Sequence, residues 1–230
     1  MLAWSKHESL EVRRFSTEGM RSRLPWAAAV PTLKKNPAPI LPILENLKQD
    51  PADWVRLSVS NNLNDISKDH PELAKKLARS WYSLSPQTGK LVKHGLRTLL
   101  KKGDAEALRI IGVADASGLE VSSFAIENPR LRVGEDLWFT FSLKNTGKTA
   151  KTIRLEYGVY YMKANGTLSR KVFKLSEGEL AAGAVRDFRR KQHFRPISTR
   201  KYHGGEHRLS IIVNGEEKGM EKLELLVSQE

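Results

Sequence analysis

The hydrophobic positions of the chain follow a helical period up to about Val113 and alternate with polar positions after Gly118. Apolar residues at spacings of three and four, interrupted by Pro, Gly, Asn or Asp, predict short amphipathic helices in the first part. The candidate helices lie at 7–15, 37–49, 52–66, 70–82, 89–103 and 104–112. The first half of the chain is therefore expected to be helical.

A short pattern recurs through these helices, in which an apolar residue is followed by arginine. The three copies are separated by 43 and 41 residues, and they lie at Val12 and Arg13, at Val55 and Arg56, and at Leu96 and Arg97. This spacing is typical of helix-pair solenoids of the HEAT class, whose repeats run about 40 to 47 residues. We therefore expect a HEAT-like α-solenoid over residues 1–114.

The residues after Gly118 are rich in β-branched and aromatic side chains in short runs, which predict strands. Asn-Gly pairs at 165–166 and 214–215 are strong hairpin signals. The predicted strand segments lie at 137–148, 152–167, 171–175, 207–219 and 221–227. Several short strands at this spacing indicate a β-sandwich over 118–230. The fold class is thus α + β in two domains, joined near residues 114–118.

Positive charge is shared by both halves of the 230-residue chain. The sequence has 39 Lys and Arg against 26 Asp and Glu, a formal net charge of +13. Up to Ala116 there are 19 basic and 12 acidic residues, and after it 20 and 14. A basic excess of this size favours a polyanionic partner, and its distribution suggests that both domains face the same one.

Several classes of protein and site are excluded by what the sequence lacks. Without cysteine there is no disulfide, thiol nucleophile or Cys-ligated metal. The chain has no glycine-rich nucleotide motif, no apolar leader and no run near the roughly 18 apolar residues of a membrane span. His203 and His207 flank two glycines in a predicted turn, so a zinc site is not expected. We expect a cytoplasmic monomer without membrane, metal or cofactor.

The helix predicted at 54–66 carries an ordered polar stripe beside its apolar stripe. Trp54, Ser58, Asn61 and Asp65 follow one another at spacings of four, three and four, and therefore share one face. An aromatic ring, a hydroxyl, an amide and a carboxylate in line suit a binding groove, with Arg56 and Lys68 near enough to reach phosphates. The alternative is that Asp65 and Asn64 are only cap residues near the end of this helix.

A second cluster, at 13–26, places one carboxylate among four arginines. Arg14 lies four residues before Glu18, and Arg21 and Arg23 follow Gly19, with Trp26 close behind. If Gly19 ends the helix, both later arginines lie on a loop, where guanidinium groups pair well with phosphate. The alternative is an ordinary surface ion pair. The basic run at 186–195 also has two interpretations, either a set of phosphate contacts or the solvated face of a strand.

Four segments of the chain resemble one known family. RRFSTEGMRSRLPWA, VRLSVSNNLNDISKDHP and RTLLKKGDAEALRIIG look like signature segments of the AlkC-like DNA alkylation repair proteins, bacterial DNA glycosylases built from HEAT-like repeats. ISTRKYHGGEHRLSIIVNG resembles the immunoglobulin-like domain that follows those repeats. The resemblance covers essentially the whole chain. Family members carry further helical repeats before this point, so the sequence is expected to be an N-terminally truncated member.

The resemblance implies excision of cationic N-methylated bases, such as 3-methyladenine, from alkylated duplex DNA without metal or cofactor. Glu18 and Asp65 match acidic positions that serve catalysis in the family, and Trp26 matches a family tryptophan. A fixed carboxylate suits this reaction on chemical grounds also, because loss of the base leaves positive charge on the sugar. The alternatives are a non-catalytic scaffold that binds nucleic acid or protein, or an inactive truncated homologue. The predicted DNA contacts are Arg14, Arg21, Arg23, Trp26, Arg56, Ser58, Asn61, Lys68, Arg189, Arg190, Lys191, Arg200 and Lys201.

Overall fold

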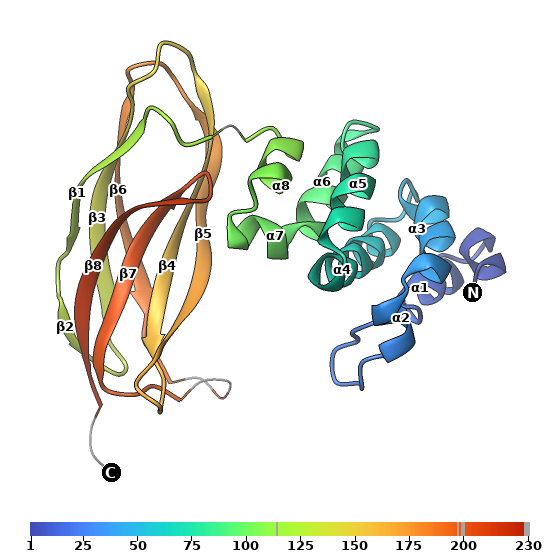
Figure 1. The fold of residues 1–230 in the computed structure, drawn as a ribbon, viewed down its shortest axis with the longest axis horizontal. Coiled ribbons are helices and arrows are strands. Elements are labelled where there is room, and N and C mark those ends of the chain that lie inside the picture. The colour runs from blue at the N-terminus through green and yellow to red at the C-terminus, as the bar shows by residue number, and fades with distance from the viewer. Residues whose placement is uncertain (114, 197, 199–200, 228–230) are drawn as a thin grey trace. The chain divides into compact units, whose positions relative to one another are not determined.

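The chain forms two compact units, Met1–Gly112 and Val113–Glu230, the first helical and the second built from strands (Figure 1). The computed structural model describes residues 1–113, 115–196, 198 and 201–227. The predicted order of fold classes, helices followed by a β-sandwich, is confirmed.

The helical unit contains two 3₁₀ turns and eight α-helices, most of them short. They are η1 (Ala3–Lys6), α1 (Leu10–Glu18), α2 (Pro31–Lys35), η2 (Ala38–Ile40), α3 (Leu41–Leu47), α4 (Asp53–Asp69), α5 (Pro71–Trp81), α6 (Pro86–Gly95), α7 (Arg97–Lys102) and α8 (Ala105–Ile110). In the described parts of the chain, no helix combines the length and the apolar character that crossing a bilayer requires.

Local signals in the sequence set several of the helix boundaries. The Ser9 hydroxyl accepts a hydrogen bond from the Val12 backbone at the start of α1, and Gly19 caps its end, as predicted. Helix α4 ends at Asp69, because Pro71 disfavours a helical conformation at the residue before it, His70. The two arginines that follow Gly19 therefore lie outside α1.

Helix α4 is the centre of the unit and contacts α1, α5 and α6. Its apolar stripe Val55, Val59, Leu63 and Ile66 is at most 2% exposed, as the helical period predicts. Helix α6 approaches very closely at Gly95, where an added Cβ would lie 2.6 Å from Cδ2 of Leu63. The glycine therefore permits the tight crossing of the two helices.

Two asparagines of α4 hold neighbouring segments by hydrogen bonds. Asn62 donates from its amide to the Thr17 carbonyl of α1 at 3.1 Å. The Asn64 side-chain oxygen accepts from the backbone N–H of Thr98 at 3.3 Å and from its hydroxyl at 2.9 Å. Both amides are buried, and the helix continues for five residues beyond Asn64. The alternative that Asn64 and Asp65 cap the helix is therefore wrong.

Within its described residues, the second unit is a sandwich of eight strands. They are β1 (Leu119–Ile126), β2 (Arg130–Arg132), β3 (Asp136–Asn145), β4 (Lys151–Met162), β5 (Leu168–Leu180), β6 (Val185–His193), β7 (Gly205–Val213) and β8 (Glu216–Leu226). One sheet has the order β1-β3-β6 and the other β2-β8-β7-β4-β5. Neighbouring strands run antiparallel, except that β2 is parallel to β8.

The two Asn-Gly pairs lie in hairpin connections, as predicted. Asn214 and Gly215 have φ of 50° and 86° between β7 and β8, the left-handed pair that a tight primed turn requires. Gly166, with φ of 77°, lies in the connection between β4 and β5. The sheet order therefore follows local turn chemistry at both positions.

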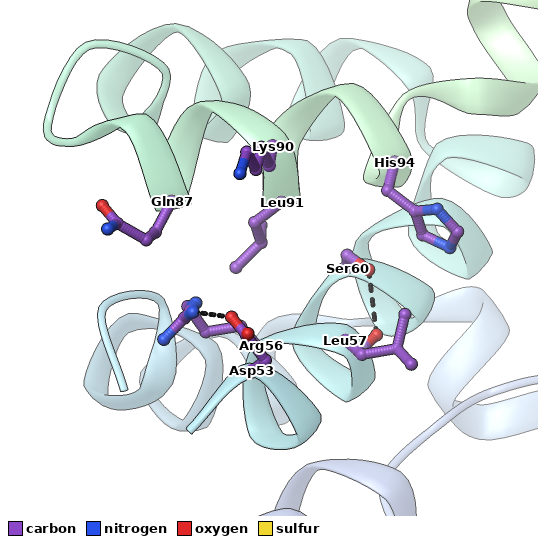
Figure 2. A pocket seen from close by; sticks show the side chains of 8 residues that line it. All are labelled: Asp53, Arg56, Leu57, Ser60, Gln87, Lys90, Leu91 and His94. Carbon is purple, nitrogen blue, oxygen red and sulfur yellow. Dashed lines mark hydrogen bonds and ion pairs between the residues drawn. The ribbon is translucent and has the colours of Figure 1, made fainter. Parts of the chain in front are cut away.

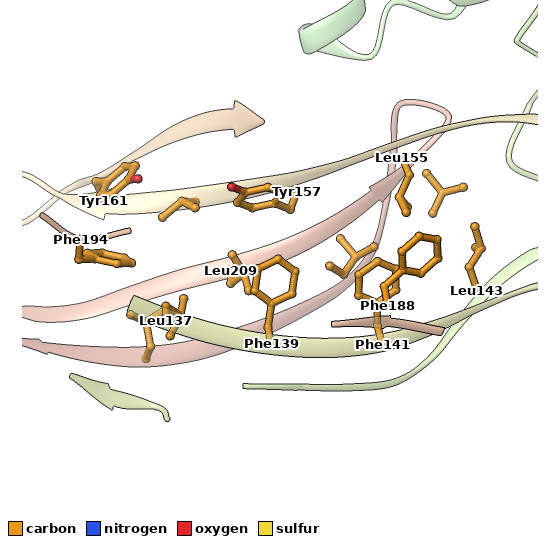
Figure 3. Packing of buried hydrophobic residues seen from close by; sticks show 14 of the residues in the cluster. Leu137, Phe139, Phe141, Leu143, Leu155, Tyr157, Tyr161, Phe188, Phe194 and Leu209 are labelled. Atoms are coloured by element: carbon orange, nitrogen blue, oxygen red, sulfur yellow. The ribbon is translucent and has the colours of Figure 1, made fainter. Parts of the chain in front are cut away.

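The core of the sandwich combines aliphatic side chains with several aromatic rings and lies between the two sheets (Figure 3). Phe141 of β3 stacks on Phe188 of β6 with ring centroids 4.8 Å apart, and Phe139 packs against Tyr157 of β4 at 5.3 Å. Phe188 belongs to the basic run at 186–195 and is the buried residue of β6, whose other side chains are exposed except for the half-buried Gln192. Burial of these rings supplies much of the packing energy of the unit.

Candidate nucleic-acid interface

Two carboxylates from α1 and α4 meet at a shared arginine. Arg21 donates from Nη1 to Glu18 Oε1 at 2.8 Å and from Nε to Asp65 Oδ2 at 2.9 Å. The Ser58 hydroxyl donates to the other Glu18 oxygen at 2.6 Å, and Lys68 contacts the other Asp65 oxygen at 3.1 Å. The structure thus joins the two carboxylates proposed for catalysis in one ionic cluster, which we call the acid–arginine cluster.

The two carboxylates differ in their access to solvent. The Glu18 side chain is 24% exposed, whereas that of Asp65 is 1% exposed. Burial raises the pKa of Glu18, but hydrogen bonds from Ser58 and Arg21 and the charge of Arg21 outweigh it, so the pKa lies below its usual value. Glu18 is therefore an ionised carboxylate held at the surface of the cluster.

The predicted direct DNA contacts by Arg21 and Ser58 need correction. Ser58 is fully buried and Arg21 is only 7% exposed, because both are packed around Glu18. Burial lowers the pKa of Arg21, but the hydrogen bonds to Asp65 and Glu18 raise it by more, so the guanidinium stays charged. These residues orient the carboxylates instead of facing a phosphate backbone.

Arg14 and Trp54 form a stacked pair beside Glu18. The Arg14 guanidinium lies 4.1 Å from the centre of the Trp54 ring and donates to the Trp54 carbonyl at 2.6 Å. Its Nη2 lies 3.6 Å from Glu18 Oε2. Trp54 is 49% exposed, whereas the Arg14 side chain is only 18% exposed, so the pair presents mainly the indole to solvent.

The loop after α1 is attached to α4 and carries a protruding tryptophan. Arg23 binds Asp69 with two hydrogen bonds, of 3.2 and 2.7 Å, which fixes the loop to the end of α4. Trp26 follows with an exposed fraction of 104% and a φ of 63°. A left-handed backbone is unfavourable for tryptophan, and such strain is concentrated at functional positions. The predicted contact of Trp26 with DNA stays a prediction.

Asn61 contacts residues of α6 and α7. Its side-chain oxygen lies 3.3 Å from His94 Nε2 and accepts from Arg97 Nη2 at 3.2 Å. The Arg97 Nη1 also donates to the His94 carbonyl at 2.7 Å. The polar stripe of α4 therefore bonds to α1 on one side and to α6 and α7 on the other.

A cavity of about 280 Å³ lies next to this stripe, between α4 and α6 (Figure 2). Arg56 lines it, but its guanidinium is bound by the Asp53 carboxylate and the Asp50 carbonyl. Lys90 and His94 line the α6 side of the same cavity. Arg56 is thus already paired, and Lys90 supplies a further cation at this edge.

The basic residues of β6 are partly neutralised. Arg189 makes two hydrogen bonds to Glu127, at 2.7 and 2.8 Å, and Lys191 contacts Asp136 at 2.9 Å. Arg190 contacts the Arg189 carbonyl and the face of Phe188, and has no carboxylate partner among the described residues. Arg189, Arg190 and Lys191 are all exposed, but two of these three cations are paired with carboxylates, so the net positive charge of this surface is lower than the sequence indicates.

Lys201 is exposed and lines a cavity of about 380 Å³ with Lys163, Arg170 and Tyr202. Arg200 lies outside the described residues. The two sets of predicted DNA contacts, on the helices and on the sandwich, belong to different units. Within each described unit, no group of three or more His, Asp or Glu residues is arranged to hold a metal ion.

Arg97 is a candidate residue of the nucleic-acid interface that was not among the contacts predicted from the sequence. It is the third copy of the recurring apolar–arginine pattern and lies in the segment that resembles the AlkC-like signature. The signal was therefore present in the sequence. Its contact with Asn61, which the sequence does place on the polar stripe, is a tertiary contact that requires the structure.

The chain thus combines a helical array, in which a buried arginine lies between two carboxylates, with a β-sandwich. Three findings show what this chain is similar to. A family model described as the C-terminal Ig-like domain of the uncharacterised protein YhaZ matches residues 120–227. The uncharacterized protein YhaZ of Bacillus subtilis (strain 168) is 44% identical over 218 residues, which cover 95% of this chain and 60% of that protein.

The third finding is a solved structure. The Pseudomonas fluorescens alkylpurine DNA glycosylase AlkC, bound to DNA containing an abasic site analog, matches with a TM-score of 0.95 and 36% identity. The match covers 97% of this chain and 62% of that one. The chain therefore spans about three fifths of the length of the relatives it matches.

Proposed function

We propose that the chain binds alkylated duplex DNA and, with the acid–arginine cluster as its active site, excises cationic N-methylated bases such as 3-methyladenine. The observation that carries the proposal is the surface carboxylate of Glu18, held ionised by Arg21 and Ser58 beside exposed aromatic side chains. The similarity to the Pseudomonas fluorescens alkylpurine DNA glycosylase supports the same conclusion.

The chemistry proposed is hydrolysis of the N-glycosidic bond. Methylation makes the base cationic, so it departs with the bond electrons as a neutral molecule and leaves positive charge on the sugar. Water then adds to the sugar carbon and loses a proton. A carboxylate near 4 Å attracts such a charge by about 4 kcal/mol at an effective dielectric constant of about 20, which corresponds to roughly three decades of rate.

Glu18 and Asp65 are the proposed catalytic carboxylates. The Glu18 carboxylate is partly exposed to solvent, whereas Asp65 is buried and forms ion pairs with Arg21 and Lys68. A preorganised negative charge needs no rearrangement when the sugar becomes positive. We therefore expect Glu18 to contribute more to the rate than Asp65.

The proposed DNA surface combines the cations and aromatic rings around the cluster. Arg14, Arg23 and Lys68 lie at its rim, and Trp26 and Trp54 present exposed rings. On the sandwich, the proposed contacts are Arg190 with Arg189, Lys191 and the loop residue Lys201. Phosphate contacts of this kind bind duplex DNA without reading its sequence.

A competing proposal is a non-catalytic scaffold that binds nucleic acid or protein, or an inactive homologue. Arg21 neutralises much of the charge of the carboxylates, as in a structural ion pair. Measurement of base release separates these functions, because a scaffold binds DNA without releasing a base.

The test is release of methylated bases from alkylated duplex DNA by this chain under single-turnover conditions. The Pseudomonas fluorescens enzyme is the positive control, and Glu18→Gln is the matched variant. We expect release by the chain and at least a tenfold loss in Glu18→Gln, equivalent to about 1.4 kcal/mol. DNA binding without any release would favour the nucleic-acid-binding scaffold. No DNA binding would refute both the glycosylase and the nucleic-acid-binding scaffold, and would leave a protein-binding scaffold or an inactive homologue.

A DNA substrate implies a cytoplasmic location, which we propose on that ground. The monomeric state stays a prediction, and light scattering of the free chain and of its DNA complex tests it.

A further inference from the structure

Arg97 is a partly buried cation without a carboxylate partner among the described residues. Arg109 also has none, but it is exposed at the end of α8, where water solvates its charge. The other arginines of the helical unit each contact a carboxylate: Arg13, Arg14, Arg21, Arg23, Arg56 and Arg79. Arg97 is therefore unusual in being both partly buried and not neutralised.

The acceptors around Arg97 are neutral. The His94 carbonyl and the Asn61 side-chain oxygen each accept one hydrogen bond from it, at 2.7 and 3.2 Å. A guanidinium has five N–H donors, so these contacts leave donors available to an anion. Burial lowers the pKa of Arg97 and the charge of Asp65 only partly offsets this, which agrees with an incompletely compensated cation.

The position of Arg97 is fixed relative to the acid–arginine cluster. It is the first residue of α7, and its guanidinium is tied through Asn61 to the polar stripe of α4. Asn61 lies four residues before Asp65, or about 6 Å along the helix axis. This rise corresponds to roughly two nucleotide steps of about 3.4 Å on one DNA strand.

We infer that Arg97 binds a phosphodiester of the DNA strand that lies along α4, with Asn61 as its positioning residue. The inference rests on the proposed function, because it takes DNA as the ligand of this surface. A planar guanidinium can bind two phosphate oxygens at once, and the neutral contacts to Asn61 and His94 preorganise it for this. The phosphate bound would lie within a few nucleotides of the sugar that faces Glu18.

The experiment measures the affinity of the whole chain for a short unmodified duplex as a function of salt concentration. Arg97→Gln is compared with Arg109→Gln, which also removes one arginine but at an exposed position outside the polar stripe. Melting temperatures are measured for both variants. Because unmodified DNA is the probe, base release does not enter the result.

We expect Arg97→Gln to weaken affinity at least fivefold and to reduce the slope of log affinity against log salt by about 1. Arg109→Gln should change affinity less than twofold. Equal effects of the two substitutions would overturn the inference, because a general loss of charge would then explain both. If the wild-type chain does not bind duplex DNA, the proposed function itself fails.

If Arg97→Gln has a lower melting temperature than the wild-type chain, a conservative variant, Arg97→Lys, still tests the inference. Arg97→Lys retains the charge but not the planar fork, so we expect an unchanged salt slope with affinity at least threefold weaker. Wild-type affinity in Arg97→Lys would show that the fork is not used, and would also contradict the inference.

Discussion

Replacing Asp65 by asparagine tests how the acid–arginine cluster is held together. Asp65 is 1% exposed, and it accepts from Arg21, which is also buried. Asparagine keeps an oxygen acceptor of the same size for the Arg21 Nε–H but removes the negative charge. A hydrogen bond to a charged group contributes about 1.5–3 kcal/mol, against about 1 kcal/mol for a neutral pair.

The second partner of Asp65 adds little, because the Lys68 side chain is 36% exposed and is screened by solvent. Arg21 also keeps Glu18 as a charged partner at 2.8 Å, so its own charge stays compensated. We therefore expect Asp65→Asn to lower the free energy of unfolding by about 1–2 kcal/mol. Asp65→Ala, which leaves the buried Nε–H unpaired, should lower it by about 3 kcal/mol.

The assay is urea unfolding followed by far-ultraviolet circular dichroism, which reports mainly on the helical unit. Asp69→Asn is the matched control, because Asp69 also binds an arginine, Arg23, but both side chains are partly exposed. It should cost less than about 0.5 kcal/mol. Wild-type stability of Asp65→Asn, or an equal cost in the control, would refute the assignment of Asp65 to a buried ionic cluster.

Three further predictions follow from close packing, from a buried histidine and from an exposed tryptophan. Gly95→Ala should lower the unfolding free energy by about 1–3 kcal/mol in urea titrations because its Cβ would meet Leu63, whereas Gly178→Ala, with nothing within 4 Å, should be near neutral. Burial lowers the pKa of His207, so the sandwich should lose stability as pH falls below about 6.5, where the unfolded chain gains a proton. Thermal melts at pH 7 and pH 5 should show this loss, and His207→Phe should reduce the difference between the two melting temperatures. Trp26→Asn should keep or slightly raise the melting temperature, because the ring is fully exposed and asparagine tolerates the left-handed backbone better than tryptophan, yet weaken duplex binding in titrations by about 1 kcal/mol or more.

Much of the architecture follows from patterns that are local in sequence. The apolar stripe from Val55 to Ile66 is visible as a helical period, and the structure buries all of it. Strand β1 was not predicted because a bulge between Ser122 and Ala125, with Ser123 at a φ of 51°, interrupts its alternation. Alternation is the signal from which strands are predicted, so a strand that breaks it is missed.

The composition of the candidate site could be predicted, but its pairing could not. The sequence places Arg21 and Arg23 together after a helix that ends at Gly19, without indicating which of them turns inward. Tertiary packing against α4 brings Arg21 between Glu18 and Asp65 and leaves Arg23 at the rim with Asp69. Long-range ion pairs depend on the crossing of helices, which periodicity does not specify.

The asparagines of α4 restrict how this helix can slide against its neighbours. Interfaces made only of Leu and Val side chains tolerate small shifts along the axis, because dispersion forces have little directionality. Asn62 and Asn64 instead form directional hydrogen bonds with Thr17 and Thr98, on two different segments, and Asn61 bonds to Arg97. A shift of α4 by one residue along its axis would break all of these hydrogen bonds. The amides therefore select one alignment of α4 with its neighbours and keep the distances between the surface charges constant.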